Sequence, residues 1–260
     1  MTPVERIQAA AQLVLARSAT TRLEALTDTW PDLSADDGYA IQNAFVAASR
    51  VSADEPLAGF KILLSREDLQ RRFSTSEPAY GQLLFRMVLK AGATVDVAGP
   101  LVTHVEPEVA FIMGTDLSGP AVTDDEILEA TAYVVAALEL PQGRMEWKAN
   151  LGNVLADNGG ARLVVVGSET VQANVVDLAA LRVRLLRNGQ LVGEGSTANV
   201  LGNPVKAMAW LCKRLNAEGR HLQAGQIVMT GSCMDAIAAS TGDVVAAEFD
   251  GLGSVSVQFA

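Results

Sequence analysis

The sequence predicts an α+β fold, and two observations favour this class. Helical periodicity marks the first fifty residues, whereas strand-like segments dominate from residue 101 onward. These strands follow one another with one or two helices among them, which differs from the regular strand–helix alternation of a doubly wound sheet. Hydrophobic residues make up 49% of the 260 residues and charged residues 19%, so the chain can bury a sizeable core.

The N-terminal part is expected to begin with two amphipathic helices. The first covers residues 4–17 and the second covers residues 35–50. Ser34 is the expected N-cap of the second helix, and Asp37, three residues later, completes a weak capping box. Such a cap satisfies backbone N–H groups that the first helical turn leaves without partners.

A short apolar strand is expected next, at residues 59–64, with Lys61 inside it. Residues 75–90 indicate a mixture of turns and helix. We therefore expect a smaller N-terminal helical or α/β part over residues 1–90 and a larger domain over residues 91–260.

The larger domain is expected to open with a strand over residues 102–113, in which Pro107 suits an edge or a bulge. The segment Thr123–Glu126 then forms a capping box. We expect the helix that it starts to run to about Leu138, so that Glu139 lies just beyond the helix end.

Strands and one helix account for the rest of the chain. Asn188-Gly189 is a strong two-residue hairpin signal, and a glycine turn at residues 251–253 joins the last two strands. Pro204 suits the first turn of a helix. The expected strands are residues 161–167, 181–186, 190–195, 226–230, 243–249 and 254–259.

Charge and cysteine content narrow the function classes. The formal net charge of −10 argues against nucleic-acid binding and against an anionic membrane surface. It leaves an anionic small substrate open, because a local metal ion or lysine can reverse the field. Cys212 and Cys233 make neither a disulfide framework nor a zinc motif. Without a signal peptide or a membrane-length apolar run, we expect a cytoplasmic protein.

Three glutamates are candidates for a metal site. Glu106 and Glu108 stand two apart in an expected strand, so both carboxylates point to one face. Adjacent carboxylates repel unless a cation lies between them, and Mg²⁺ or Mn²⁺ prefers oxygen ligands. Glu139 stands between two leucines and is a candidate third ligand. A solvated strand face and an exposed helix end are the structural alternatives.

Lys61, Asp157 and Ser232 are further candidates. A lysine within an apolar strand can have a depressed pKa and act as acid, base or carboxylate anchor, or its ammonium can reach the surface. Asp157 lies in a polar turn that turn chemistry alone explains. Ser232 ends an apolar strand where backbone N–H groups can meet an anion, although most strand ends are only turns.

Seven short blocks, taken in order, resemble one family: the 2-oxopent-4-enoate hydratases and 4-oxalocrotonate decarboxylases of the fumarylacetoacetate hydrolase superfamily. The similarity extends over about residues 5–260, and its most specific part is Glu-x-Glu followed by a third Glu about thirty residues on. The blocks are Gly59-Phe-Lys-Ile62, Glu77-Pro-Ala-Tyr-Gly81, Val105-Glu-Pro-Glu-Val-Ala-Phe111, Leu138-Glu-Leu-Pro141, Ala156-Asp-Asn158, Met229-Thr-Gly-Ser232 and Gly251-Leu-Gly-Ser-Val-Ser256.

The resemblance implies a fold and an activity. It implies a mixed β-roll or β-sandwich core, with a fumarylacetoacetate hydrolase-like catalytic domain over residues 91–260. It also implies a lyase that uses Mg²⁺ or Mn²⁺ on a small 2-hydroxydienoate or 2-oxo acid from aromatic meta-cleavage catabolism, with hydration the expected reaction. A homo-oligomer and a complex with a pathway partner enzyme are further implications.

The same resemblance assigns roles to the candidate residues. It implies that the three glutamates are metal ligands and that Lys61 is catalytic and binds the substrate. Asp157 and Ser232 are expected to line or support the substrate pocket, with Lys61 beside the substrate's carboxylate and enol.

Several positions depart from the family pattern. Hydratases of this group often have an acid where Ala79 stands, a small glycine where Leu63 stands, and Asp-Ser where Gln142-Gly143 stands. The missing acid favours the alternative of a 4-oxalocrotonate-type decarboxylase. A C–C hydrolase, a tautomerase and a non-catalytic partner subunit also stay open.

Overall fold

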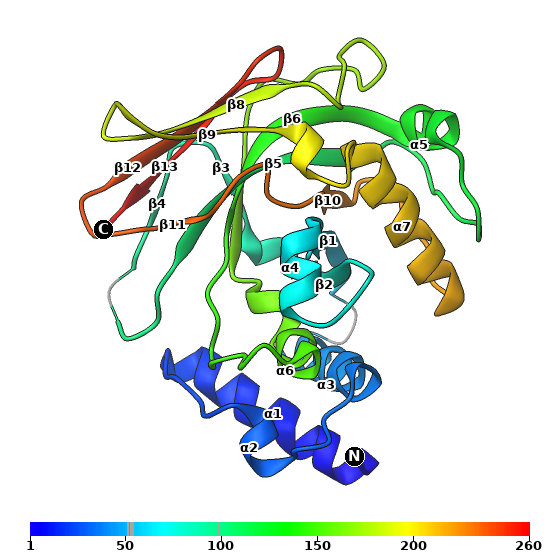
Figure 1. Cartoon of the computed structure of the whole chain (residues 1–260), viewed down its shortest axis with the longest axis vertical. Coiled ribbons are helices and arrows are strands. Elements are labelled where there is room, and N and C mark those ends of the chain that lie inside the picture. The colour runs from blue at the N-terminus through cyan, green and yellow to red at the C-terminus, as the bar shows by residue number, and fades with distance from the viewer. Residues whose placement is uncertain (51, 53–54, 98) are drawn as a thin grey trace.

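Two curved sheets stand above a layer of helices in the computed structural model, which describes residues 1–50, 52, 55–97 and 99–260 (Figure 1). The mixture of helices and strands confirms the α+β class expected from the sequence. None of the helices in these ranges is both long and apolar enough to cross a membrane.

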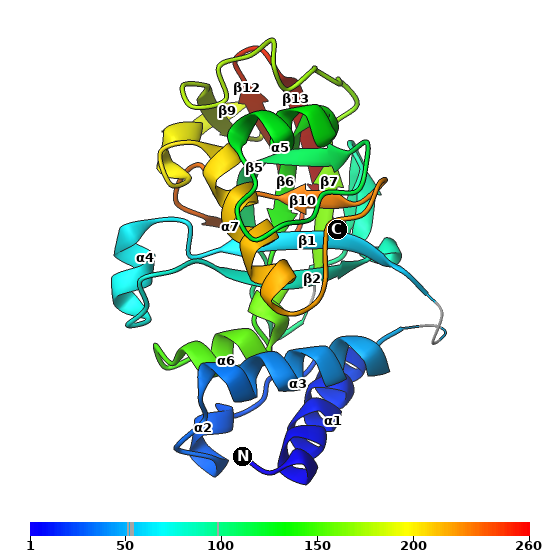
Figure 2. The ribbon, with the colours of Figure 1, turned by 90° about the vertical axis from the view of Figure 1, so that its right-hand side faces the viewer.

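The helical layer contains both helices expected near the N-terminus (Figure 2). Its members are α1 (Pro3–Ala19), α2 (Leu26–Thr29), α3 (Ala35–Ala48) and α6 (Leu151–Ala156). The expected capping box of α3 is confirmed, because Ser34 Oγ accepts a hydrogen bond from Asp37 N and the Asp37 carboxylate accepts one from Ser34 N. These helices cover one face of the larger sheet.

The larger sheet has eight strands in the order β2-β1-β10-β5-β6-β7-β3, and the short strand β11 pairs with β5. Its strands are β1 (Leu57–Leu63), β2 (Ala79–Leu84), β3 (Val88–Lys90), β5 (His104–Met113), β6 (Thr131–Leu140), β7 (Leu163–Val166), β10 (Ile227–Met229) and β11 (Ile237–Ala238). Strands from before residue 90 thus pair with strands from the last forty residues, since β1 runs parallel to β10. The division at residue 90 stays a prediction.

The smaller sheet has five strands in the order β4-β13-β12-β8-β9. They are β4 (Ala93–Val95), β8 (Arg182–Arg187), β9 (Gln190–Ser196), β12 (Val244–Phe249) and β13 (Gly253–Phe259). The expected hairpin at Asn188-Gly189 joins β8 to β9, and both turn residues have the positive φ that this tight turn requires.

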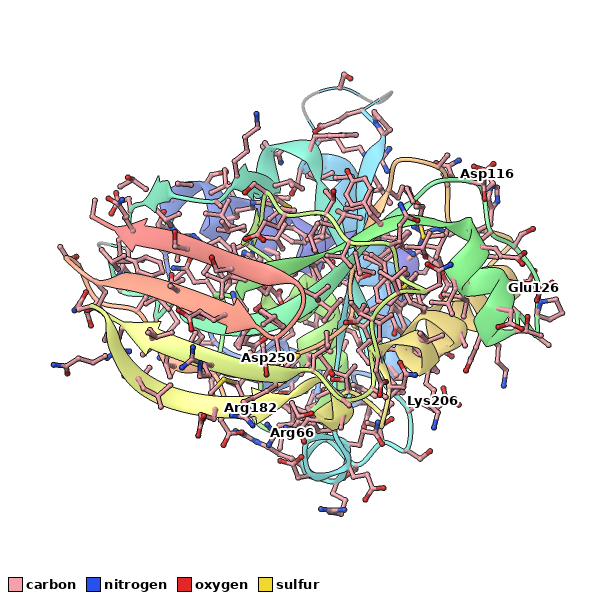
Figure 3. The ribbon with its side chains drawn as sticks, turned by 90° about the horizontal axis from the view of Figure 1, so that it is seen from above. Arg66, Asp116, Glu126, Arg182, Lys206 and Asp250 are labelled. Atoms are coloured by element: carbon pink, nitrogen blue, oxygen red, sulfur yellow. The ribbon has the colours of Figure 1, made fainter. Side chains whose placement is uncertain are left out.

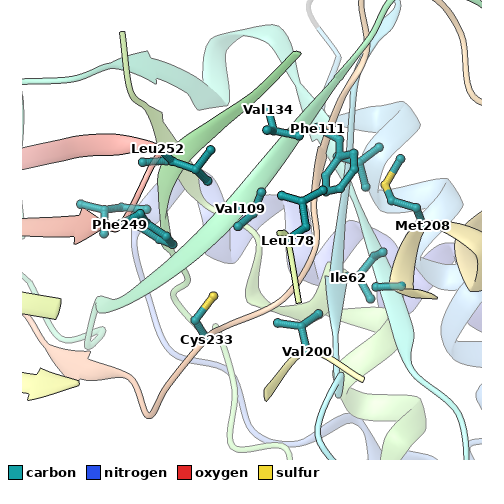
Figure 4. Packing of buried hydrophobic residues seen from close by; sticks show 14 of the residues in the cluster. Ile62, Val109, Phe111, Val134, Leu178, Val200, Met208, Cys233, Phe249 and Leu252 are labelled. Atoms are coloured by element: carbon teal, nitrogen blue, oxygen red, sulfur yellow. The ribbon is translucent and has the colours of Figure 1, made fainter. Parts of the chain in front are cut away.

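Three further helices and three 3₁₀ turns lie among the strands of the described residues. They are α4 (Glu67–Arg72), α5 (Asp124–Ala130), α7 (Pro204–Ala217) and the 3₁₀ turns η1 (Phe85–Met87), η2 (Asn158–Gly160) and η3 (Thr197–Asn199). Helix α7 begins at Pro204 as expected. The main core fills the space between the two sheets, where Phe111 and Val134 of the larger sheet and Phe249 of the smaller one belong to one apolar cluster (Figure 4).

Two sequence expectations were wrong, and both mistook strand for helix. The helix expected up to Leu138 ends at Ala130, and the next ten residues form β6. Residues 79–84 and 88–90 form β2 and β3 where turns and helix were expected. Strands β2 and β6 are largely buried, so neither shows the polar alternation that separates a strand from a buried helix, and β3 is too short to show a period.

Candidate metal centre and active-site cavity

Strands β5 and β6 bring the three glutamates together. The two strands are antiparallel, and Glu106 lies directly opposite Glu139 while Glu108 lies opposite Ala137. Because side chains alternate along a strand, Glu106 and Glu108 share one face, and Glu139 joins them from the neighbouring strand. One carboxylate oxygen from each lies within 4.8 Å of the other two. Glu139 lies in β6, and both Glu108 and Glu139 are buried, so the alternatives of a solvated strand face and an exposed helix end are wrong.

Two of the three carboxylates are buried and accept few hydrogen bonds, whereas Glu106 is half-buried. Glu108 is 0% exposed and Glu139 is 1% exposed. Glu108 Oε2 accepts a hydrogen bond from Gly231 N at 2.8 Å, but in the described part of the chain Glu108 Oε1 and both Glu139 oxygens accept none. Burial and the neighbouring glutamates raise the pKa of Glu108 well above its usual range, because few groups stabilise its charge.

Lys61 of β1 is the cation that faces this cluster. Its Nζ forms an ion pair with Glu139 Oε1 at 2.7 Å, and it donates to Gly159 O at 2.9 Å. Burial works against the ammonium, but Glu139 and Glu106 outweigh it and raise the pKa of Lys61. This direction is opposite to the depressed pKa considered from the sequence. The alternative of a lysine that reaches the surface is wrong, since Lys61 is 2% exposed.

These residues fit a hard divalent cation. Three carboxylates in contact need positive charge between them, and a single lysine offsets only one of them. The buried oxygens that accept no hydrogen bond are the ligand atoms such an ion requires. Carboxylate-only donors favour Mg²⁺ or Mn²⁺ over zinc, which prefers histidine and cysteine.

A cavity of about 680 Å³ opens over the cluster, with Lys61, Glu106 and Ser232 among its lining residues. Its apolar wall consists of Ile62, Leu63, Leu64, Leu69, Phe73, Leu101, Val102, Met145 and Trp147. Its basic lining consists of Arg22, Arg66, Arg72, His104 and Lys148. A cavity that combines an apolar wall with convergent polar and charged groups is typical of a site for a small molecule.

Trp147 forms part of the wall, and the sequence offered no signal for it. Its indole N–H donates to Asp157 Oδ2 at 3.0 Å. Its ring lies against Gly143 and Gly160, where an added Cβ would come within 3.4 Å and 3.1 Å of ring carbons. Asp157 is fully buried, does not line the cavity, and also forms an ion pair with Arg144 at 2.6 Å. Its position suits support of the pocket wall better than contact with a substrate.

The departures from the family pattern cluster in the structure. Leu63 lines the cavity and lies opposite Ala79 in the β1–β2 pair. An added Cβ on Gly159 would come within 3.0 Å of a Leu63 methyl carbon, so Leu63 fills the space beside the loop that holds Lys61. Gln142 donates to Leu101 O at 3.2 Å and to Thr103 Oγ1 at 3.0 Å, so its amide supports the segment that leads into β5.

Comparison with known proteins identifies the family of the chain. The family model of the fumarylacetoacetate hydrolase C-terminal domain matches residues 67–260. The chain is 33% identical to a 2-keto-4-pentenoate hydratase of Paraburkholderia xenovorans, over 100% of this chain and 96% of the relative. It is also 33% identical to a 2-hydroxyhexa-2,4-dienoate hydratase of Comamonas testosteroni, over 94% of this chain and 92% of the relative.

A solved structure extends the match to the whole fold. The 4-oxalocrotonate decarboxylase from Pseudomonas putida G7, complexed with magnesium and adipate, superposes with a TM-score of 0.94 at 26% identity, over 100% of this chain and 99% of that one. With the family model covering most of the sequence and full-length relatives above 30% identity, the chain belongs to the fumarylacetoacetate hydrolase family.

Proposed function

We propose that this protein is a metal-dependent hydratase of a small 2-hydroxy-2,4-dienoate, the enol form of an unsaturated 2-oxo acid. The observation that carries the proposal is the convergence of three carboxylates and one buried lysine on a single cavity. The full-length relatives named as hydratases support hydration over the other reactions of the family.

Glu106, Glu108 and Glu139 would hold Mg²⁺ or Mn²⁺. When bound, such an ion supplies a Lewis acid for the carboxylate and 2-oxygen of the substrate, which stabilises the negative charge of an enolate. The magnesium named in the decarboxylase structure supports a hard divalent cation. Manganese is an alternative because it prefers the same ligands.

Lys61 would bind the oxygen on which charge develops. An ammonium has three N–H groups, of which one points to Gly159 O and another side faces Glu139. The remaining N–H can donate to the enolate oxygen of a substrate in the cavity. As a 2-hydroxydienoate ketonises, the 2-hydroxyl loses a proton and the far carbon of the diene gains one, after which water adds to the conjugated alkene. Lys61 stabilises the enolate oxygen during this step.

Ser232 would bind the substrate, and Asp157 would support the cavity wall. Ser232 lines the cavity, and its hydroxyl donates to Met234 O at 2.7 Å, which leaves its oxygen to accept a hydrogen bond from the substrate. Asp157 would act through Trp147, whose indole ring it holds in the cavity wall.

A 4-oxalocrotonate-type decarboxylase is the second candidate, and the pair Leu63 and Ala79 favours it. The two residues lie opposite each other, so the acid that hydratases often have at position 79 is missing where it would face Leu63. Decarboxylation forms the same enolate as carbon dioxide leaves, and it needs no group to activate water. The metal ligands serve either reaction equally well.

Other features of the proposal follow from the family. We infer a homo-oligomer in the cytoplasm that acts in aromatic catabolism beside a pathway partner enzyme. A C–C hydrolase or tautomerase would use the same enolate, whereas a non-catalytic subunit would have little need of three acids held together.

An ultraviolet progress curve tests the proposed function. Purified protein with Mg²⁺ or Mn²⁺ receives freshly generated 2-hydroxypenta-2,4-dienoate and, separately, 2-oxohex-3-enedioate, and mass spectrometry identifies the products. We expect the gain of one water on the first substrate, and Glu106→Gln should reduce the rate on the order of a hundredfold or more because it removes one charged ligand.

The outcomes separate the candidates. Loss of carbon dioxide from the second substrate, with no hydration of the first, would establish the decarboxylase instead. Protein that binds the metal but turns over neither substrate would overturn both proposals.

A further inference from the structure

A second cavity, of about 300 Å³, lies between the end of α1, the η1 turn and the start of β7. Four arginines line it: Arg17, Arg86, Arg144 and Arg162. The remaining lining residues are Thr20, Met87, Leu101, Gln142 and Leu163, so the described lining holds no acidic side chain. The protein carries a formal net charge of −10, and four of its 20 basic residues meet at this one place.

Two of these arginines form ion pairs with carboxylates that do not line the cavity. Arg144 pairs with Asp157 at 2.6 Å, and Arg86 pairs with Glu55 at 3.5 Å. The cavity therefore keeps a surplus of positive charge, even after both ion pairs are counted.

Arg162 is anchored by neutral oxygens. It donates to Thr103 Oγ1 at 2.8 Å and to the backbone oxygen of Asp96 at 2.5 Å. Burial and the charge of Arg144 lower the pKa of Arg162, although the Asp96 carboxylate works in the opposite direction. Its guanidinium is thus fixed in direction by two neutral oxygens, and the Asp96 carboxylate offsets only part of its charge.

Among the four arginines, the positive charge of Arg17 is the least offset by hydrogen bonds or ion pairs with described residues. Among the described residues, its guanidinium forms no hydrogen bond and no ion pair. Its Cζ lies over the ring of Phe45, 5.9 Å from the ring centroid. Burial, followed by the charges of Arg144 and Arg86, lowers the pKa of Arg17 to about 10. Its place in the last turn of α1 gives a favourable interaction with the helix dipole, and its half-buried guanidinium keeps N–H donors that no oxygen of the described residues accepts.

We propose that this cavity binds a small, doubly charged oxyanion, namely a phosphate group or a dicarboxylate. Guanidinium groups bind such anions through paired N–H···O bonds, and several arginines around one cavity are costly without a counter-charge. The volume suits one small anion rather than a long chain. This inference is independent of the proposed reaction, because none of the four arginines lines the larger cavity.

The site lies next to the larger cavity. Leu101 lines both, and Gln142, which holds the backbone of Leu101, lines the arginine cavity. Arg144 also shares Asp157 with Trp147 of the larger cavity. An anion bound among the arginines would thus contact the residues that support the wall of the other cavity.

Isothermal titration of the Mg²⁺-loaded protein tests the proposal, with inorganic phosphate and succinate as separate probes in chloride buffer at constant ionic strength. We expect saturable binding of at least one probe at about one per chain. Arg17→Met should weaken that binding on the order of tenfold, because it removes charged hydrogen bonds but keeps much of the apolar stem. Arg17→Lys should retain an intermediate affinity. Stronger binding of phosphate would indicate a phosphorylated ligand, and stronger binding of succinate would indicate a dicarboxylate.

Two matched controls separate this site from general charge and from the larger cavity. Arg182→Met removes one exposed charge from β8 in the smaller sheet (Figure 3), and Arg72→Met removes one from the larger cavity. Both variants should bind the probes as the unchanged protein does.

Three results would overturn the proposal. The first is the absence of saturable binding, and the second is equal loss of binding in Arg182→Met or Arg72→Met. The third is a change of oligomeric state in Arg17→Met by sedimentation, which would indicate an acidic segment of a second copy in the cavity. Should Arg17→Met fail to fold by circular dichroism, Arg17→Lys and Arg162→Met supply the same comparison.

Discussion

At the scale of single residues, the centre is organised by buried charge. Three carboxylates face one ammonium in surroundings where Glu108, Glu139 and Lys61 are almost completely buried. Burial raises the pKa of Glu139, and Lys61 lowers it only in part. A protein that keeps such a cluster gives up stability without its counter-ion, and this cost is the physical reason to assign a metal function to it.

Lys61→Met separates catalysis from metal binding. We expect kcat to fall on the order of a hundredfold or more, because the variant loses the N–H donor for the enolate. We expect Mg²⁺ to bind at least as tightly as before, since a neighbouring positive charge is gone. Steady-state kinetics and metal titration measure the two effects, with the exposed Lys206→Met as the control (Figure 3). A kcat within threefold of the original value would exclude Lys61 from the reaction.

The sequence could predict part of this centre and not the rest. Glu106 and Glu108 follow from strand periodicity alone, because a spacing of two fixes a shared face. The residues around Glu139 made it only a candidate ligand beside an expected helix end, and the family resemblance favoured the ligand role. Trp147 forms the cavity wall together with Phe73, whose ring centroid lies 6.4 Å from that of Trp147 and which belongs to a distant segment. No spacing in the sequence records such a contact.

At the scale of elements, the sequence was most informative where local chemistry decides the structure. The caps of α3 and α5 and the Asn188-Gly189 turn rest on hydrogen bonds or backbone angles within a few residues. Strand β6 was missed because its ten residues are mostly buried, so that only pairing with β5 and β7 distinguishes it from a helix. That pairing is set by the whole sheet.

Asp37 of α3 binds Arg6 of α1, and this contact between the two helices depends on pH. Burial opposes its charge, but hydrogen bonds from Ser34 and Arg6 outweigh burial and lower the pKa of Asp37 below its usual range. The stabilisation is therefore complete above the unfolded pKa of about 4 and is lost as the pH falls through the lower folded value. We expect Asp37→Asn to reduce the free energy of unfolding by about 1–2 kcal/mol at pH 7.

Urea unfolding between pH 7 and pH 3 measures this link. The difference between Asp37→Asn and the unchanged protein should stay constant down to about pH 5 and shrink below about pH 4. Asp36→Asn is the matched control, because Asp36 lies in the same helical turn but is exposed. A difference that grows as the pH falls would contradict the assigned sign.

At the scale of the whole molecule, the centre joins segments that are far apart in the chain. Lys61 comes from β1, the glutamates come from β5 and β6, and the N–H group that binds Glu108 belongs to Gly231 after β10. These strands are neighbours in the middle of the larger sheet. An ion bound by the glutamates would find its complete set of ligands only in the folded chain, so metal binding should stabilise the fold as a unit.

Thermal unfolding tests this coupling. Mg²⁺ at a hundred times its dissociation constant should add about 2.7 kcal/mol to the stability by mass action, which corresponds to a rise in Tm of about 5–10 °C for a chain of this size. Glu108→Gln should lose most of this rise, because it replaces a charged ligand by a neutral amide. Its metal-free form should unfold at or above the Tm of the metal-free original, since one buried negative charge is removed. An equal rise in both proteins would mean that Mg²⁺ binds elsewhere on the acidic surface, and the three glutamates would then lose their assignment as its ligands.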